Sequence, residues 1–144
     1  STVVRKALND GNFTAANALL GHAYRFSGTV IKGAGIGRGL GFPTANIQPD
    51  EVMKLLPSNG VYEVDALLNG ERIKGVMNIG TNPTVRDCML RSIEVHLLDF
   101  SGDIYGAGIT VEPVRRLRGE VKFGSIDALK LQIGVDVARV RRGI

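Results

Sequence analysis

Apolar and polar residues alternate along the middle of the chain, which is the pattern of half-buried strands. Residues 62–68 alternate in this way and lead into Asn69-Gly70, a strong signal for a hairpin turn. Residues 72–79 follow as the partner strand. A further strand covers residues 92–98 and is paired, after a turn, with residues 109–114. Short strands at this spacing predict an antiparallel sheet that closes or packs on itself.

Helical signals lie at the two ends of the chain instead. Residues 5–8 form the end of a short helix, and Asn12 or Thr14 caps a second helix that stops at Gly21. Ser125 caps a last helix, whose apolar residues recur at helical spacing: Ile126, Leu129, Ile133, Val137 and Val140. We therefore expect a mainly β fold, a small closed antiparallel Greek-key-like barrel of about six strands with N-terminal helices and a C-terminal helix.

Glycines occupy alternate positions from residue 33 to residue 41. Backbone amides of glycine approach a ligand closely, and groups of such amides form anion-binding hollows. Basic side chains on either side add positive charge. The stretch predicts a phosphate-binding loop or, on the same residues, a flexible surface loop followed by an Asn turn. The binding interpretation assigns phosphate contacts to Lys32, Gly33, Gly35, Gly37, Arg38 and Gly41.

The glycines lead into Pro43, Thr44 and Asn46. If the chain stays extended after Pro43, Thr44 and Asn46 project from the same face, because strand side chains alternate. Their hydroxyl and carboxamide oxygens then converge on one point. Two neutral oxygens suit Mg²⁺ when nucleotide phosphates balance most of its charge. The sequence therefore predicts a site for Mg²⁺ with nucleotide phosphates here.

The predicted strand 92–98 places Glu94 and His96 on one face and apolar residues on the other. This polar face is either solvated or functional. In the functional interpretation, Glu94 is a general base that accepts the proton of an alcohol during phosphoryl transfer. We interpret His96 as a hydrogen-bonding neighbour of Glu94.

Composition narrows the classes of protein. The chain has 144 residues, the size of one domain, and a single cysteine that cannot form an internal disulfide. It shows no secretory signal, and no apolar run reaches the roughly 20 residues that cross a bilayer. These features predict a cytoplasmic protein without a membrane partner. The net charge of +4 permits a polyanionic partner, but eight aromatic residues without tryptophan provide few stacking platforms for nucleic acid.

The run Gly-Arg-Gly-Leu-Gly-Phe-Pro-Thr-Ala-Asn, residues 37–46, resembles the signature of the riboflavin kinase module in bacterial bifunctional FAD synthetases. Residues 78–84, 94–99 and 117–123 stand in the order and rough spacing of that family. The resemblance extends from Gly28 to the C-terminal helix. Departures are mild and are confined to two apolar positions: Val85, where an aromatic residue is common, and Ile104, where leucine is usual.

The resemblance implies that this chain phosphorylates the 5′-hydroxyl of riboflavin with ATP and Mg²⁺, giving FMN and ADP. The stretch with Thr44 and Asn46 would hold Mg-ATP, and Glu94 would activate the hydroxyl. A mobile loop carrying Arg118, Glu120 and Phe123 would cover the flavin.

The resemblance also implies a division of the chain. Residues 1–21 would be the helical remnant of a nucleotidyltransferase module that is covalently linked in the full-length protein. Residues 22–144 would be the kinase domain, which would make no FAD by itself. Two competing functions remain open: a barrel that carries or senses FMN without making it, and a small nucleic-acid-binding barrel, which the positive charge favours.

Overall fold

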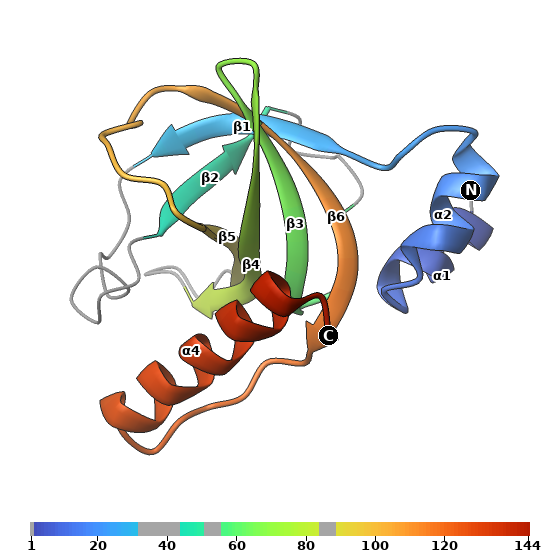
Figure 1. Cartoon of the computed structure of the whole chain (residues 1–144). Coiled ribbons are helices and arrows are strands. Elements are labelled where there is room, and N and C mark those ends of the chain that lie inside the picture. Colours follow the sequence, from blue (N-terminus) through green and yellow to red (C-terminus); the bar gives the residue numbers. More distant parts are fainter. Residues whose placement is uncertain (1, 32–43, 51–55, 84–88) are drawn as a thin grey trace.

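The computed structural model describes residues 2–31, 44–50, 56–83 and 89–144. In this part of the chain, six antiparallel strands close into a barrel with the neighbour order β1-β2-β5-β4-β3-β6 (Figure 1). The elements are α1 (Thr2–Asn9), α2 (Phe13–Leu20), β1 (Phe26–Ile31), β2 (Ala45–Pro49), β3 (Gly60–Leu68), β4 (Glu71–Pro83), β5 (Met89–Leu97), β6 (Gly108–Arg118) and α4 (Ile126–Arg142). The expected mainly β barrel with helices at both ends is confirmed.

The predicted hairpin turn and helix caps are present in the structure. Asn69 and Gly70 both have positive φ, at 51° and 82°, so the β3–β4 hairpin turns with the hand that suits twisted strands. Asn12 rather than Thr14 caps α2, because its side chain accepts a hydrogen bond from the amide of Ala15. Ser125 caps α4 in the same way.

Strands β4 and β6 extend beyond the predicted 72–79 and 109–114. In β6 the cause is visible in its pairing with β3, where the register shifts twice. Such bulges add a residue to one strand and break the alternation of inward and outward side chains. The apolar residues consequently no longer alternate as in a strand after Val114, although the pairing with β3 continues to Arg118.

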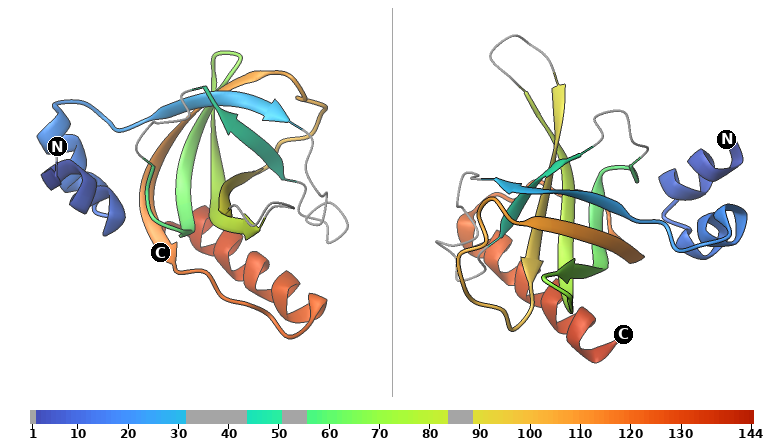
Figure 2. Two further views of the ribbon diagram at one scale, coloured as in Figure 1. Left: turned by 180° about the vertical axis from the view of Figure 1, so that it is seen from behind. Right: turned by 90° about the horizontal axis from the view of Figure 1, so that it is seen from above.

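The barrel interior is the main hydrophobic core, with Tyr62, Met77, Ile79 and Val95 among its fully buried residues. Helices α1 and α2 belong to the same core, because the Phe13 ring meets Tyr62 edge-on with ring centroids 5.7 Å apart. They lie apart from α4 in every view (Figures 1 and 2).

Helix α4 packs on the outside of the barrel. Val137 and Val140 of the helix form a second buried cluster with Val61, Val76 and Leu117 of the strands. Figure 2 shows α4 lying across the outer surface of the barrel, with the segment after β6 running along it. This packing leaves space between the helix and the strands β4 and β5.

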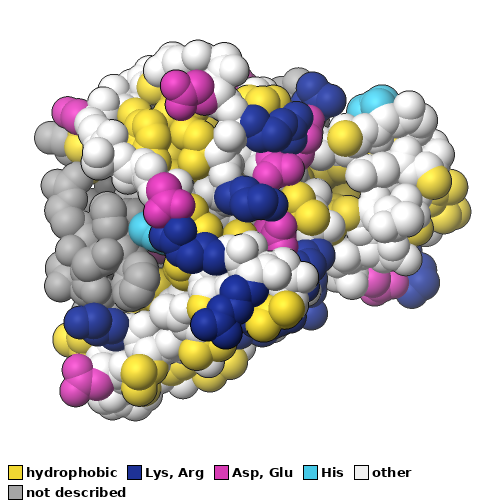
Figure 3. All heavy atoms as spheres, viewed as in Figure 1, with side chains coloured by type: hydrophobic (Ala, Val, Ile, Leu, Met, Phe, Trp, Pro, Cys, Tyr) yellow, Lys and Arg dark blue, Asp and Glu magenta, His cyan; other side chains and the backbone are white. Residues whose placement is uncertain are grey.

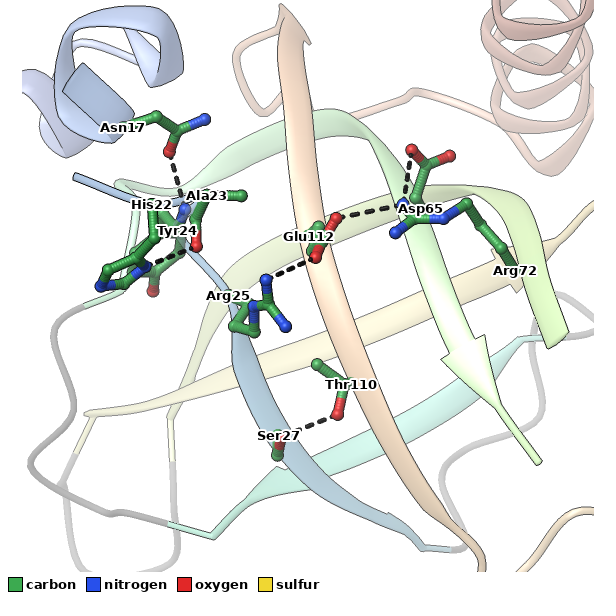
Figure 4. A network of polar contacts seen from close by, with 10 residues as sticks. All are labelled: Asn17, His22, Ala23, Tyr24, Arg25, Ser27, Asp65, Arg72, Thr110 and Glu112. Carbon is green, nitrogen blue, oxygen red and sulfur yellow. Dashed lines mark hydrogen bonds and ion pairs between the residues drawn. The ribbon is translucent and has the colours of Figure 1, made fainter. Parts of the chain in front are cut away.

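Ion pairs join the strands on another part of the outer surface. Arg72 donates to Asp65 Oδ2 at 3.2 Å and to Glu112 Oε2 at 3.0 Å, and Arg25 pairs with Glu112 Oε1 at 3.2 Å (Figure 4). The arginines are half exposed, so each pair stabilises the fold only modestly. Their effect is to link β3, β4 and β6 to the residue preceding β1.

Gly28 marks the closest approach of two strands. A Cβ atom at this position would collide with the carbonyl oxygen of Gln48 and lie 2.7 Å from Ile47 Cγ2. Gly28→Ala should therefore lower the free energy of unfolding by about 1–3 kcal/mol through overpacking. Urea unfolding checks this. Gly108→Ala is the matched control because a Cβ there meets no atom within 4 Å; equal losses in the two variants would contradict the steric explanation.

Candidate active site

Three neighbouring strands align polar side chains in one row. Glu94 on β5 is paired with Asn46 on β2 and, on its other side, with Asn78 on β4. Residues directly opposite each other in an antiparallel sheet share a face. The inward neighbours Val95 and Met77 are buried in the barrel, so this row lies on its outer face. The carboxylate therefore stands between two carboxamides that are far away in the sequence.

A cavity of about 600 Å³ lies over this row. Strands β4 and β5 contribute Asn78, Glu94 and His96, and Thr44 lies at its edge just before β2. The opposite wall consists of the segment after β6 and of apolar side chains of α4, Leu129 and Ile133. The cavity combines a polar floor with apolar walls, which is typical of sites for small organic ligands.

Arg118 at the end of β6 and Phe123 in the segment that follows both line the cavity, and the Arg118 guanidinium lies over the Phe123 ring, 5.8 Å from its centroid. Arg118 also donates to both oxygens of Asp136 on α4, with the shortest distance 2.8 Å at Nη2, and to the carbonyl of Gly119 at 3.2 Å. The guanidinium plane is thus held from two sides.

Glu94 is half-buried, and burial raises the pKa of its carboxyl group above the ordinary value of 4.5. The charged form loses water contacts at this position, which favours the protonated form. A carboxylate with a raised pKa is a stronger base than an exposed one. The position therefore suits proton acceptance.

Glu120 folds back over β4. A Cβ atom at Gly80 would collide with the Glu120 carboxylate oxygen Oε1 and would lie 3.7 Å from the Ser92 hydroxyl. The absence of a side chain at residue 80 consequently creates the seat for the Glu120 carboxylate. The Glu120 side chain therefore lies against the outer face of β4 at this point.

A second cavity of about 570 Å³ lies next to the first. Its walls include the apolar residues Val30, Ala45 and Leu97, and the loop of residues 100–105 covers one side. Thr44 lines both cavities. Among the described residues, Thr44 is therefore the point that the two cavities share.

Comparison with known proteins identifies the family of the chain. Residues 20–144 match the flavokinase family, described as riboflavin kinase. The chain belongs to the riboflavin kinase family. The family predicted from the motifs, and with it the enzyme class, is therefore confirmed.

Curated relatives of this chain are longer than it is. The bifunctional riboflavin kinase/FMN adenylyltransferase of Escherichia coli (strain K12) is 45% identical over 142 residues, which cover 98% of this chain and 44% of the relative. The protein of the same name from Bacillus subtilis (strain 168) is 44% identical over 138 residues, covering 94% and 43%. The chain spans less than half the length of these relatives.

Two solved structures share the arrangement. The riboflavin kinase from Trypanosoma brucei superposes with a TM-score of 0.56 and 27% identity, covering 82% of this chain and 74% of that chain. A protein described as a macrolide-efflux protein from Streptococcus pneumoniae superposes with a TM-score of 0.89 and 35% identity, covering 98% and 46%. No helix in the described part of the chain is long and apolar enough to cross a membrane.

The structure describes six of the twelve predicted site residues, and it brings these six together. Five of them line the first cavity: Thr44, Glu94, Arg118, Glu120 and Phe123. Asn46 joins them through its pairing with Glu94. The predicted phosphate contacts lie outside the described residues: Lys32, Gly33, Gly35, Gly37, Arg38 and Gly41.

Asp136 is a site residue that our sequence analysis missed. Its side chain is fully buried, with 1% of the residue exposed, and it lines the cavity. A signal was present, because residue 136 follows Ile133 by three and precedes Val140 by four and so falls on the apolar stripe of the helix. An acidic residue within such a stripe requires a buried partner.

Replacing Gly80 tests the seat of Glu120. Gly80→Ala should displace the carboxylate without unfolding the barrel, because the colliding atom is the end of a flexible side chain. The expected result is an unchanged melting temperature and a KM for riboflavin raised on the order of tenfold. Steady-state kinetics and thermal melts check this. Gly124→Ala, in the same segment with no atom within 4 Å, is the control; an unchanged KM in Gly80→Ala would contradict a role for this contact.

Glu94 should make stability depend on pH. Its pKa is raised in the folded state, so the folded protein holds this proton more tightly than the unfolded chain does. The resulting stability is fully present below the ordinary pKa of 4.5 and is lost as pH rises through the higher folded pKa. Glu94→Gln removes this loss, so it should be more stable than the wild type near neutral pH, and the difference should shrink towards acid pH.

Urea unfolding at several pH values measures this difference. Glu71→Gln, at an exposed position of β4, controls for the loss of one negative charge from the barrel. A Glu94→Gln variant less stable than the wild type near neutral pH would show that the carboxylate makes favourable contacts that outweigh its burial.

Proposed function

We propose that this chain transfers the γ-phosphoryl group of ATP to the 5′-hydroxyl of riboflavin, giving FMN and ADP. The observation that carries the proposal is the position of Glu94 in the floor of the first cavity, opposite Asn46 and close to the point where Thr44 joins the second cavity. Two adjoining cavities with a base near their junction suit a reaction between two bound substrates. Membership of the riboflavin kinase family supports the same reaction.

The flavin belongs in the first cavity. Its walls provide apolar side chains for a planar ring system, and the stacked Arg118 and Phe123 provide a flat polar edge. The hydroxyl-bearing chain of riboflavin would then extend along the row of Asn78, Glu94 and Asn46. This arrangement points the 5′-hydroxyl towards Thr44.

The nucleotide belongs in the second cavity. Its apolar walls suit an adenine ring, and its end at Thr44 would receive the phosphates. The glycine-rich stretch of residues 33–41 lies between β1 and β2 in the sequence, immediately before this end. Backbone amides in such a stretch would screen phosphate charge.

Mg²⁺ fits the residues near the junction. The described residues contain no group of three or more His, Cys, Asp or Glu that could hold a metal ion. The hydroxyl oxygen of Thr44 and the carboxamide oxygen of Asn46 are hard, neutral ligands of the kind that Mg²⁺ takes together with phosphate oxygens. When bound, the ion would neutralise charge on the phosphates.

Glu94 would act as the base. Its carboxylate would orient the 5′-hydroxyl and accept its proton while the oxygen attacks the γ-phosphorus. The new O–P bond forms as the bond to the β-phosphate oxygen breaks, and ADP leaves with the electron pair. Most of the rate enhancement would come from alignment, because phosphoryl transfer requires little covalent chemistry from the protein.

The division of the chain at residues 21 and 22 is part of the proposal. The relatives are named for two activities, and this chain spans less than half of their length. We propose that residues 1–21 belong to the end of a nucleotidyltransferase module and that the chain alone makes no FAD. A cytoplasmic location and the absence of a nucleic-acid partner stay predictions. On the face in Figure 3, basic side chains are interleaved with acidic ones rather than gathered into one stripe.

Turnover in a purified reaction tests the function. Riboflavin, ATP and Mg²⁺ with the chain should yield FMN and no FAD, separated by chromatography, and omission of Mg²⁺ should stop the reaction. Glu94→Gln should lower kcat by roughly 10²–10⁴-fold with little change in KM for riboflavin, because the base acts in the chemical step.

Each outcome bears on a separate part of the proposal. Binding of riboflavin without any FMN would favour the FMN-carrying barrel, and salt-sensitive binding of oligonucleotides would favour the nucleic-acid-binding barrel. Near-normal turnover of Glu94→Gln would exclude this residue as the base. Any FAD would contradict the proposed division of the chain.

A further inference from the structure

We propose that Asp136 is a positioning residue for the flavin ring: it fixes the Arg118 guanidinium against Phe123 and thereby presents a flat, hydrogen-bonding edge to the first cavity. The inference rests on the proposed function, because it names the residue that prepares the flavin side of that site. The ligand class that fits is a planar heteroaromatic ring with acceptor atoms in its plane.

The geometry around Asp136 is that of a fixed support. The Arg118 Nε donates to Oδ1 at 3.2 Å and to Oδ2 at 3.0 Å, while Nη2 donates to Oδ2 at 2.8 Å. The amide of Gln132, one turn earlier on α4, donates to Oδ1 at 3.0 Å. Only 2% of the Asp136 side chain is exposed, against 20% of the Arg118 side chain. The carboxylate is thus held inside the protein, and the guanidinium reaches the cavity.

The fold does not require this ion pair to hold α4. Replacing a buried ion pair with apolar residues is often neutral or stabilising, because removing two charges from water is costly. Val137 and Val140 pack the helix against the barrel through apolar contacts, and Arg139 Nη1 donates to the Leu117 carbonyl at 3.0 Å. A second ion pair, Arg141 with Asp99 at 2.6 and 2.8 Å, already joins the helix to the barrel. The buried pair of Arg118 and Asp136 therefore needs an explanation other than attachment of the helix.

Arg118 keeps binding capacity after its structural contacts are made. A guanidinium has five N–H groups in one plane. Asp136 and the Gly119 carbonyl take up three of them, so two N–H groups have no acceptor among the residues that the structure describes. The pairing with Asp136 also neutralises the charge, so the group can stack on a ring without attracting a counter-ion into the cavity. Planar donors beside a stacked aromatic residue match the carbonyl-bearing edge of an isoalloxazine ring.

Asp136→Asn tests the inference with Asp99→Asn as the matched control. Both substitutions remove the negative charge of an Arg–Asp pair between α4 and the barrel, but only Asp136 lines the first cavity. Asp99 has a positive φ of 56°, which asparagine tolerates equally well. The readouts are the melting temperature, riboflavin binding followed by flavin fluorescence in the presence of Mg-ADP, and the separate values of kcat and KM.

In Asp136→Asn, the riboflavin Kd and KM should rise roughly ten- to a hundredfold, while the KM for ATP and the kcat at saturating riboflavin stay within about twofold. Asp99→Asn should leave all four values unchanged. A folded Asp136→Asn protein that binds riboflavin like the wild type would overturn the inference. If the wild type neither binds riboflavin nor forms FMN, the proposed function itself fails, which these readouts separate from a defect confined to the variant.

The double variant Arg118→Gln with Asp136→Asn covers the case in which Asp136→Asn does not fold. Glutamine and asparagine can hydrogen-bond to each other, so the double variant should regain a melting transition near that of the wild type. Riboflavin binding should remain weak, because the planar cation is gone. Recovery of both stability and riboflavin affinity in the double variant would show that the pair serves folding alone and would overturn the inference.

Discussion

The pairing of β5 between β2 and β4 is the constraint on which the site depends. Closure of the barrel fixes the register of these three strands, and the register sets Glu94 directly opposite Asn46 and Asn78. Because side chains alternate along a strand, a shift of one residue would turn Glu94 into the barrel interior and Val95 out of it. The apolar residues that fill the barrel therefore also determine which face the carboxylate occupies. The same residue pairs therefore specify both the packing of the core and the positions of the polar side chains in this row.

Helix α4 supplies the wall that turns the polar row of the barrel into a cavity. A row of polar side chains on the outside of a sheet is ordinarily solvated. Its pKa values and binding properties change only when another element covers the row and excludes water. The cluster of Val137 and Val140 against the strands holds α4 at the distance that leaves a cavity over Glu94. Partial burial then raises the pKa of that carboxyl group. The same apolar contacts that anchor the helix thus adjust the acidity of a residue on a distant strand.

Much of this architecture could be predicted from local sequence signals. The hairpin at Asn69-Gly70, the caps at Asn12 and Ser125, and the strand carrying Glu94 all depend on residues within a few positions of one another. Local signals failed where distant segments determine the structure. The bulges of β6 arise from its pairing with β3, and no short-range pattern announces them.

The same distinction between local signals and distant contacts applies to the site. The motif containing Thr44 and the strand containing Glu94 were recognised separately, whereas their convergence follows from the barrel order. The burial partner of Arg118 lies 18 residues away on another element, so its identity as Asp136 required the packed helix. The apolar stripe of α4 carried a hint of it, because an acid in such a stripe must be matched. The sequence alone did not show that Asp136 and Arg118 are partners.

The close approach of the Glu120 carboxylate to Gly80 makes the residue types at positions 80 and 120 depend on each other. Strand residues on an outer face usually change freely among small and polar types, but here any side chain would occupy the space of the Glu120 carboxylate. A lineage that places a larger residue at position 80 must also shorten, remove or redirect residue 120. The two positions are therefore expected to covary among related sequences, although 40 residues separate them and one is in a strand while the other is in a loop.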